Sequence, residues 1–181
     1  TILPDDAFFI FKVAANIVQG LGSTFDGINP SNGYHPLWVG VLVLVYKFFG
    51  TGLVGDIGPI KIALYITVAL NAMTALVIAR ILTRFTQSAW IRSFGMIVWL
   101  LNPFLLYETL NGIETAPALF FFSIFCLLAL RIEEKPGRAR DYFWAGVIGG
   151  LMVLTRLDMG FYVFAFLVWI LLRHGLRGGW K

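Results

Sequence analysis

Charged residues and thiols are scarce in this 181-residue chain. Only 13% of its residues are charged and 59% are hydrophobic, whereas soluble domains carry about 25% charged residues. A soluble fold needs a polar exterior, so this composition excludes an ordinary soluble protein. Cys126 is the only cysteine, which excludes an intrachain disulfide. It also lies far along the chain from both histidines, so no zinc site of the cysteine–histidine type is predicted.

The apolar residues form long runs that are separated by short polar breaks. Uncharged stretches cover residues 93–107 and 115–130, and roughly 20 apolar residues cross a bilayer as a helix. We predict an all-α fold, a polytopic transmembrane helix bundle of about five spans with additional juxtamembrane helices. Three glycines in one span predict a helix-packing face: Gly146, Gly149 and Gly150. The predicted spans are residues 58–82, 93–107, 116–130, 142–155 and 159–172.

Two shorter segments precede these spans. Residues 7–18 are rich in aromatic side chains and predict an interfacial helix, and residues 37–50 are too short to cross a bilayer upright. We therefore divide the chain into an extracytoplasmic first loop with juxtamembrane helices (1–57) and a transmembrane helix bundle (58–181). Two alternatives stay open at this point. Residues 37–50 form a tilted span in one of them, and residues 142–172 form a single long helix in the other.

The distribution of charge gives the bundle a predicted orientation. The net charge is +4, but the basic residues lie in short clusters between apolar runs, which is typical of membrane topology and not of a nucleic-acid partner. The positive-inside rule makes the side with these clusters cytoplasmic. It receives Arg80, Arg84, Arg92, Arg131, Lys135, Arg138, Arg140, Arg173, Arg177 and Lys181, and the other side receives Asp5, Asp6, Asp26, Glu108, Glu114 and Asp158.

The adjacent carboxylates Asp5 and Asp6 are the first candidates for chemistry. They stand at the expected start of a helix, and repulsion between neighbouring carboxylates makes one of them a better proton acceptor. The competing interpretation is a helix N-cap, a position that aspartate commonly takes.

The loop that follows is the second candidate. Residues 25–38 combine turn formers, hydroxyls, amides and aromatic rings, including Asp26, Asn32, Tyr34 and His35. Such a loop can hydrogen-bond a sugar and stack on its apolar face. The alternative is a structural connector beside an aromatic interface belt.

Two further polar breaks lie on the same predicted side. Residues 111–115 contain Glu114, and residues 155–158 contain Arg156 and Asp158. An arginine beside the membrane can hold a phosphate with two parallel hydrogen bonds. An internal ion pair between Arg156 and Asp158 that fixes a helical turn is the competing interpretation.

These motifs together resemble the GT-C type membrane glycosyltransferases. The Asp5-Asp6 pair and residues 25–27 and 32–38 are similar to the first extracytoplasmic loop of protein O-mannosyltransferases, the aminoarabinose transferase of lipid A and arabinofuranosyltransferases. The resemblance implies that Asp5 is the catalytic base and Asp6 its neighbour. Residues 111–115 resemble a later loop with a second acidic residue, and residues 154–158 an element whose basic residue lies near the donor phosphate. Family members have a helix before the acidic pair and further helices after the last span, so we expect this chain to be the N-terminal half without its first helix.

The function that this resemblance implies is sugar transfer from a polyprenyl-phosphate donor to an acceptor hydroxyl, with inversion, at the extracytoplasmic face of a bacterial inner membrane. Catalysis is expected from Asp5 and Asp6, with substrate binding by Asp26, Asn32, Tyr34, His35, Glu114, Arg156 and Asp158. No cofactor is required, and the acidic residues permit a divalent cation without demanding one. The expected partners are the lipid-linked donor, membrane lipid, an acceptor that the sequence does not identify and other membrane subunits. The alternatives are a non-catalytic subunit of a larger complex and a transporter segment.

Overall fold

The computed structural model describes residues 3–50 and 57–175 and confirms an all-α fold. This part of the chain forms helices and no β-strand, apart from an isolated bridge between Thr24 and Pro30. The helices are α1 (Asp5–Val18), α2 (Pro36–Phe49), α3 (Gly58–Leu82), α4 (Ala89–Leu101), α5 (Pro103–Thr109), α6 (Thr115–Glu134), α7 (Ala139–Thr155), the 3-10 helix η1 (Leu157–Met159), α8 (Gly160–Ile170) and the π-helix η2 (Leu171–Gly175).

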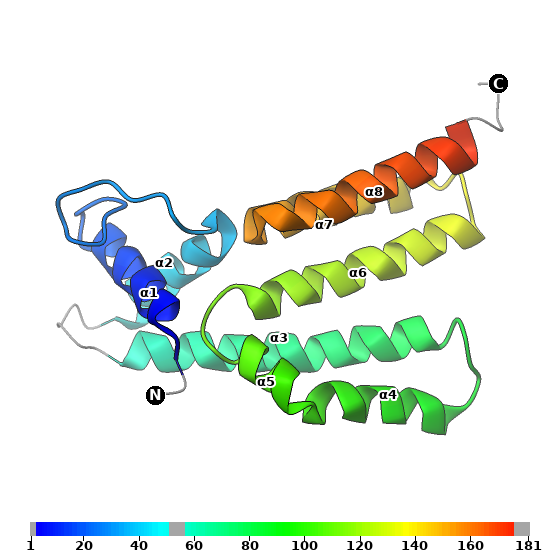
Figure 1. Ribbon diagram of the computed structural model, residues 1–181, viewed down its shortest axis with the longest axis horizontal. Helices are drawn as coiled ribbons and strands as arrows, with labels where there is room; N and C mark the ends of the chain where they lie inside the picture. Colours follow the sequence, from blue (N-terminus) through cyan, green and yellow to red (C-terminus); the bar gives the residue numbers. More distant parts are fainter. Residues whose placement is uncertain (1–2, 51–56, 176–181) are drawn as a thin grey trace.

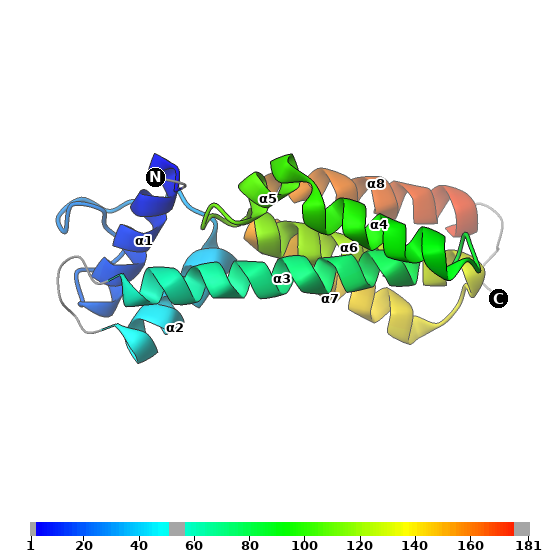
Figure 2. The same ribbon diagram turned by 90° about the horizontal axis from the view of Figure 1, so that it is seen from below.

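The long helices lie side by side along one direction. Helix α6 packs against both α3 and α7, and α4 packs against α3 (Figures 1 and 2). Helix α8 contacts α7 near the break between them, where Val163 lies beside Gly149. Helices α1 and α2 and the loop between them lie together at one end of this bundle (Figure 1). The connections α3–α4 and α6–α7 lie at the opposite end.

Helices α3 and α6 are long and apolar enough to cross a membrane. They have 25 and 20 residues, and the predicted spans 58–82 and 116–130 fall within them. The pair α4 and α5 makes a third span if the two are taken together. Helices α7 and α8 have 17 and 11 residues, and at about 1.5 Å per residue both are shorter than a hydrocarbon core of roughly 30 Å.

The predicted span 93–107 is not one straight helix, because the chain bends by 59° between α4 and α5. Asn102 has extended backbone angles and ends α4, while Pro103 begins α5. The Asn102 side chain accepts hydrogen bonds from the backbone N–H groups of Phe104 and Leu105 at 3.0 and 3.1 Å. An asparagine cap followed by proline at the first helical position therefore starts a new helix inside an uncharged run.

Helices α7 and α8 are separated by a break at Arg156. The backbone of Arg156 is extended, with φ −153° and ψ 127°, so the predicted turn at 155–158 is confirmed and a single helix over 142–172 is wrong. Of the predicted glycine face, only Gly149 is buried. A Cβ at Gly149 would lie 3.3 Å from Val163 of α8, whereas Gly146 and Gly150 face open space.

The end of the bundle that carries α1 and α2 has its own hydrophobic core. Trp38 and Leu42 of α2 are fully buried against α1, and Ala63 of α3 joins the same cluster. Buried Asn16 of α1 donates from its side-chain nitrogen to the carbonyl oxygens of Thr24 and Phe25 at 2.9 and 3.1 Å. This amide ties the following loop to the core.

Ion pairs join the helix ends at the basic end of the bundle. Arg84, after α3, pairs with Glu134 at the end of α6, and Arg173 of η2 lies 2.6 Å from Glu133. These pairs confirm that Arg84 and Arg173 lie at the same end of the bundle as the end of α6, as the charge pattern predicted. Arg177 and Lys181, which the prediction placed on the same side, lie outside the described residues.

Candidate functional site

A buried glutamate organises the opposite end of the bundle. Glu114 is the residue before α6, and its side chain is 8% exposed. Its Oε1 lies 3.5 Å from Nε2 of His35 and 3.7 Å from Nη1 of Arg156. His35 immediately precedes α2, and Arg156 lies at the break after α7. Three segments that are remote in sequence therefore meet at one carboxylate.

Asp158 holds the Arg156 guanidinium through two parallel hydrogen bonds. Nε of Arg156 donates to Oδ1 at 3.0 Å and Nη2 donates to Oδ2 at 2.9 Å. This pairing raises the pKa of Arg156, with smaller contributions from the charges of Glu114 and Glu108. The same hydrogen bonds lower the pKa of Asp158 below its ordinary value. The internal pair is thus formed, and it fixes the orientation of the arginine.

The pair leaves part of the guanidinium available for a ligand. A guanidinium carries five N–H donors, and Asp158 accepts from only Nε and Nη2. Oε1 of Glu114 lies 3.7 Å from Nη1, which is too long for a hydrogen bond. Nδ1 of His35 is buried without a hydrogen-bond partner among the described residues. The cluster can therefore bind an additional polar or anionic group.

The loop that carries Glu114 is held from both sides. Nε1 of Trp38 donates a buried hydrogen bond of 3.0 Å to the carbonyl oxygen of Gly112. Gly112 has φ +82°, and a Cβ there would lie 3.1 Å from Cζ of Phe11. Asn111 accepts through Oδ1 from the N–H of Ile113 at 3.2 Å. The sequence indicated this polar break but not the role of Trp38, whose contact is remote along the chain.

Asp5 and Asp6 are the first two residues of α1, and both are exposed. The N-cap is Pro4 and no side chain caps the helix, so the capping interpretation is not supported. The side chain of Leu3 would lie 3.3 Å from a Cβ at Gly112. The start of α1 therefore lies beside the loop that leads to Glu114, although no ion pair joins either aspartate to the cluster among the described residues.

Most side chains of the first loop bind the loop itself. Asp26 accepts from the backbone N–H of Asn29 at 2.7 Å, from its side chain at 2.6 Å and from the N–H of Ile28 at 2.8 Å. These bonds lower the pKa of Asp26 to about 2. Tyr34 Oη lies 2.7 Å from Ser23 Oγ. Among the predicted residues of this loop that the structure describes, Asn32 is exposed and His35 alone reaches the Glu114 cluster.

The described residues contain no group of three or more His, Cys, Asp or Glu side chains placed to hold a metal ion. The carboxylates of Glu114 and Asp158 are both directed at the guanidinium of Arg156.

Comparison with protein families supplies the chemical context of this site. A family model described as dolichyl-phosphate-mannose-protein mannosyltransferase matches residues 39–181. Glu114, Arg156 and Asp158 lie inside the matched region, while Asp5, Asp6, Asp26, Asn32, Tyr34 and His35 lie before it. No match was found among curated proteins or solved structures. The matched region covers more than half of the sequence and the helices carry membrane-spanning runs, so this chain belongs to the dolichyl-phosphate-mannose-protein mannosyltransferase family of membrane glycosyltransferases.

Proposed function

We propose that this chain carries the sugar-transfer site of a polyprenyl-phosphate-dependent glycosyltransferase. In this proposal the donor is a sugar linked to a polyprenyl phosphate, the acceptor is a hydroxyl group, and transfer inverts the anomeric centre. The reaction takes place at the end of the bundle that carries the Glu114 cluster, on the extracytoplasmic face of a bacterial inner membrane. The family match supports the reaction class, and the charge distribution supports the orientation.

One observation carries this proposal: Arg156 is directed toward buried Glu114 while Asp158 holds its other edge. A guanidinium oriented in this way at the end of the membrane helices suits a phosphate that enters from the lipid. The remaining N–H groups of Arg156 would donate to the phosphate oxygens. Glu114 and Asp158 are then positioning residues, because both act on the donor through Arg156.

The bond changes follow from an inverting displacement. The acceptor oxygen attacks the anomeric carbon, and the bond from that carbon to the phosphate oxygen breaks with its electron pair retained by the leaving polyprenyl phosphate. Negative charge grows on the phosphate as this bond breaks, and Arg156 stabilises it there. In our proposal His35, which touches Glu114 through Nε2, assists at the same phosphate.

Asp5 is our proposed general base. Its carboxylate is exposed at the first turn of α1, where an acceptor hydroxyl arriving from the aqueous side can meet it. Asp5 accepts the hydroxyl proton as the new bond forms. In this proposal the negative charge of the neighbouring Asp6 carboxylate favours the uptake of that proton by Asp5. Asn32 and Tyr34 bind the sugar in this scheme, while Asp26 acts by shaping the loop through its bonds to Ile28 and Asn29.

The donor enters within the membrane, so no soluble nucleotide sugar takes part. The proposed partners are the lipid-linked donor, the surrounding lipid and the acceptor. The acidic residues permit a divalent cation at the donor phosphate without demanding one.

A transfer assay in membranes tests this function with the protein in its full-length form. Radiolabelled sugar is supplied either on a polyprenyl phosphate or on a nucleotide, and the anomeric configuration of the product is determined by NMR. We expect transfer from the lipid-linked donor alone, with inversion. Retention of configuration would refute the single-displacement chemistry. Absence of transfer from every lipid-linked sugar tried, with the protein correctly folded and inserted, would favour a non-catalytic subunit.

A further inference from the structure

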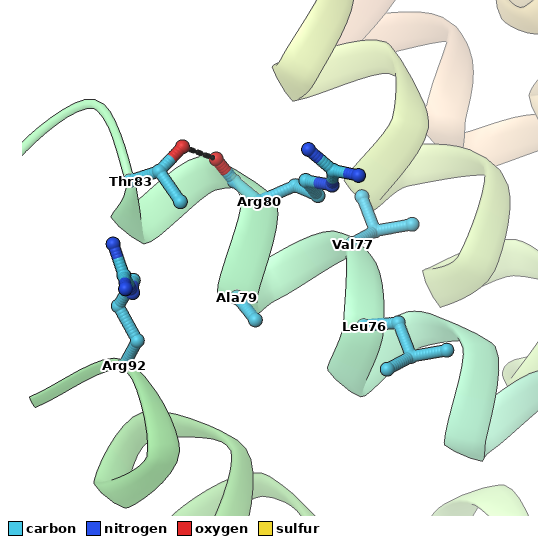
Figure 3. Close-up of a pocket in the computed structure, with 6 residues that line it drawn as sticks. All are labelled: Leu76, Val77, Ala79, Arg80, Thr83 and Arg92. Atoms are coloured by element: carbon cyan, nitrogen blue, oxygen red, sulfur yellow. Dashed lines mark hydrogen bonds between the residues drawn. The ribbon is translucent and has the colours of Figure 1, made fainter. Parts of the chain in front are cut away.

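A groove at the basic end of the bundle lies far from the Glu114 cluster. It has a volume of about 520 Å³ and lies between the last turns of α3 and the start of α4. Leu76, Val77 and Ala79 supply its apolar wall, and Arg80, Thr83 and Arg92 supply its polar groups (Figure 3). Leu76 is 59% exposed, so the apolar part opens on the outer surface of the helices.

The two arginines of this groove have no acidic partner. Neither Arg80 nor Arg92 has a carboxylate within ion-pair distance among the described residues, whereas Arg84 and Arg173 at the same end are both paired. Arg92 extends from α4 toward Thr83, and Arg80 extends past Val77 (Figure 3). Two uncompensated positive charges thus flank an apolar channel.

The aromatic residues beside the groove place it at the membrane surface. Trp90, two residues before Arg92, is 86% exposed, and Phe85, two residues after Thr83, is 71% exposed. Exposed aromatic side chains at the end of a membrane helix mark the level of the lipid headgroups. The guanidinium groups therefore lie where phosphates of the bilayer are found, and the apolar wall continues toward the hydrocarbon.

We infer that this groove binds one anionic phospholipid of the leaflet at the basic end. Arg92 donates hydrogen bonds to its phosphate, Arg80 supplies a second positive charge beside the headgroup, and one acyl chain lies along Leu76, Val77 and Ala79. A basic pocket between membrane helices on this side is the kind of site that recognises anionic headgroups. The site is separate from the proposed sugar-transfer chemistry, and its occupancy does not depend on a donor or an acceptor.

Native mass spectrometry of the purified full-length protein tests the inference. The protein is released from nanodiscs that contain phosphatidylglycerol and phosphatidylcholine, and the retained lipid is identified. We expect the wild type to retain one phosphatidylglycerol. The double variant Arg80→Gln/Arg92→Gln should bind it roughly 30-fold more weakly, because each basic residue at the surface contributes a severalfold factor. Ala79→Trp fills the groove without changing the charge and should also lose the lipid.

Matched controls separate a specific site from general attraction. Arg138→Gln/Arg140→Gln removes two positive charges from the same end but outside the groove, and it should retain the lipid. An equal loss in both double variants, or retention in Arg80→Gln/Arg92→Gln and in Ala79→Trp, would overturn the proposal. Thermal unfolding in nanodiscs of phosphatidylcholine alone confirms that the compared variants fold. Soluble glycerol phosphate should not displace the lipid, because it lacks the acyl chain, and displacement by it would overturn the assignment to a lipid.

Discussion

The indole nitrogen of Trp38 donates a hydrogen bond of 3.0 Å to the carbonyl oxygen of Gly112, 74 positions further along the chain. This bond joins the first turn of α2, which follows His35, to the loop that ends at Glu114. It therefore fixes the relative position of two residues that meet in the candidate site, His35 and Glu114.

Trp38→Phe removes this donor and leaves a buried carbonyl oxygen without a partner. We expect the free energy of unfolding to fall by about 1–3 kcal/mol and sugar transfer to fall as well, because the Glu114 loop loses its anchor. Trp99→Phe is the matched control, since it removes the 2.6 Å bond to Asn71 between α3 and α4. It should destabilise the bundle without reducing transfer. Equal transfer by the two folded variants would show that the Trp38 bond does not position the site.

Gly112→Ala introduces two costs at once. The left-handed φ of +82° costs roughly 1–2 kcal/mol for a residue with a Cβ, and the new carbon would lie 3.1 Å from Cζ of Phe11. Gly137 has φ +91° and open space around it, so Gly137→Ala carries the backbone cost alone. We expect Gly112→Ala to be the more destabilising of the two in thermal unfolding, by about 1 kcal/mol or more. Equal losses would mean that the site relaxes around the added methyl group.

Arg156→Lys keeps the positive charge but loses the planar fork that Asp158 holds. A lysine cannot reproduce two parallel hydrogen bonds, so the phosphate ligand is no longer oriented. We expect transfer from the lipid-linked donor to fall by about 10²-fold. Arg173→Lys makes the same change at the opposite end, where Arg173 pairs with Glu133, and should leave transfer near the wild-type rate. Unchanged transfer by Arg156→Lys would remove Arg156 from the proposed phosphate site.

Asp26 gives the first loop a defined response to acid. Its pKa is lowered from 3.8 to about 2, chiefly by the backbone N–H of Asn29. A lowered pKa means that the ionised carboxylate stabilises the folded loop above pH about 4, and that this contribution is lost as the pH falls toward about 2. A carboxyl NMR titration in micelles should give a midpoint near 2 for Asp26. Asn29→Ala should raise that midpoint, while Asn32→Ala should not. A midpoint near 3.8 in the wild type would contradict the observed turn.

The sequence predicted those helices and breaks whose positions are decided by the cost of placing charged residues in a bilayer. Helices α3 and α6 follow from long uncharged runs with basic residues at their ends, because charges are expensive within a bilayer. The same cost predicted the break at Arg156. The bend after Asn102 was missed, since asparagine and proline carry no charge and therefore do not interrupt the uncharged run of residues 93–107. Local capping chemistry, and not hydropathy, decides that boundary.

The candidate site was predicted only in part. The charge alternation placed Glu114, Arg156 and Asp158 on one side, and the structure brings them together. The contact between His35 and Glu114 depends on how α2 packs, which periodicity does not reveal. The role of Asp26 in substrate binding stays a prediction; the structure shows its carboxylate hydrogen-bonded within its own turn, which composition did not reveal.

The role of Asp5 is the central claim, and a pair of acid-to-amide substitutions tests it most directly. Asp5→Asn keeps the size of the side chain and removes the base, whereas Glu134→Gln makes the same kind of change at the opposite end, beside Arg84. Transfer of radiolabelled sugar from polyprenyl phosphate is measured for both variants in the full-length protein, with insertion and thermal unfolding compared to the wild type. The account predicts a fall of about 10²- to 10⁴-fold for Asp5→Asn and almost none for Glu134→Gln. Full transfer activity in a folded Asp5→Asn variant would contradict it.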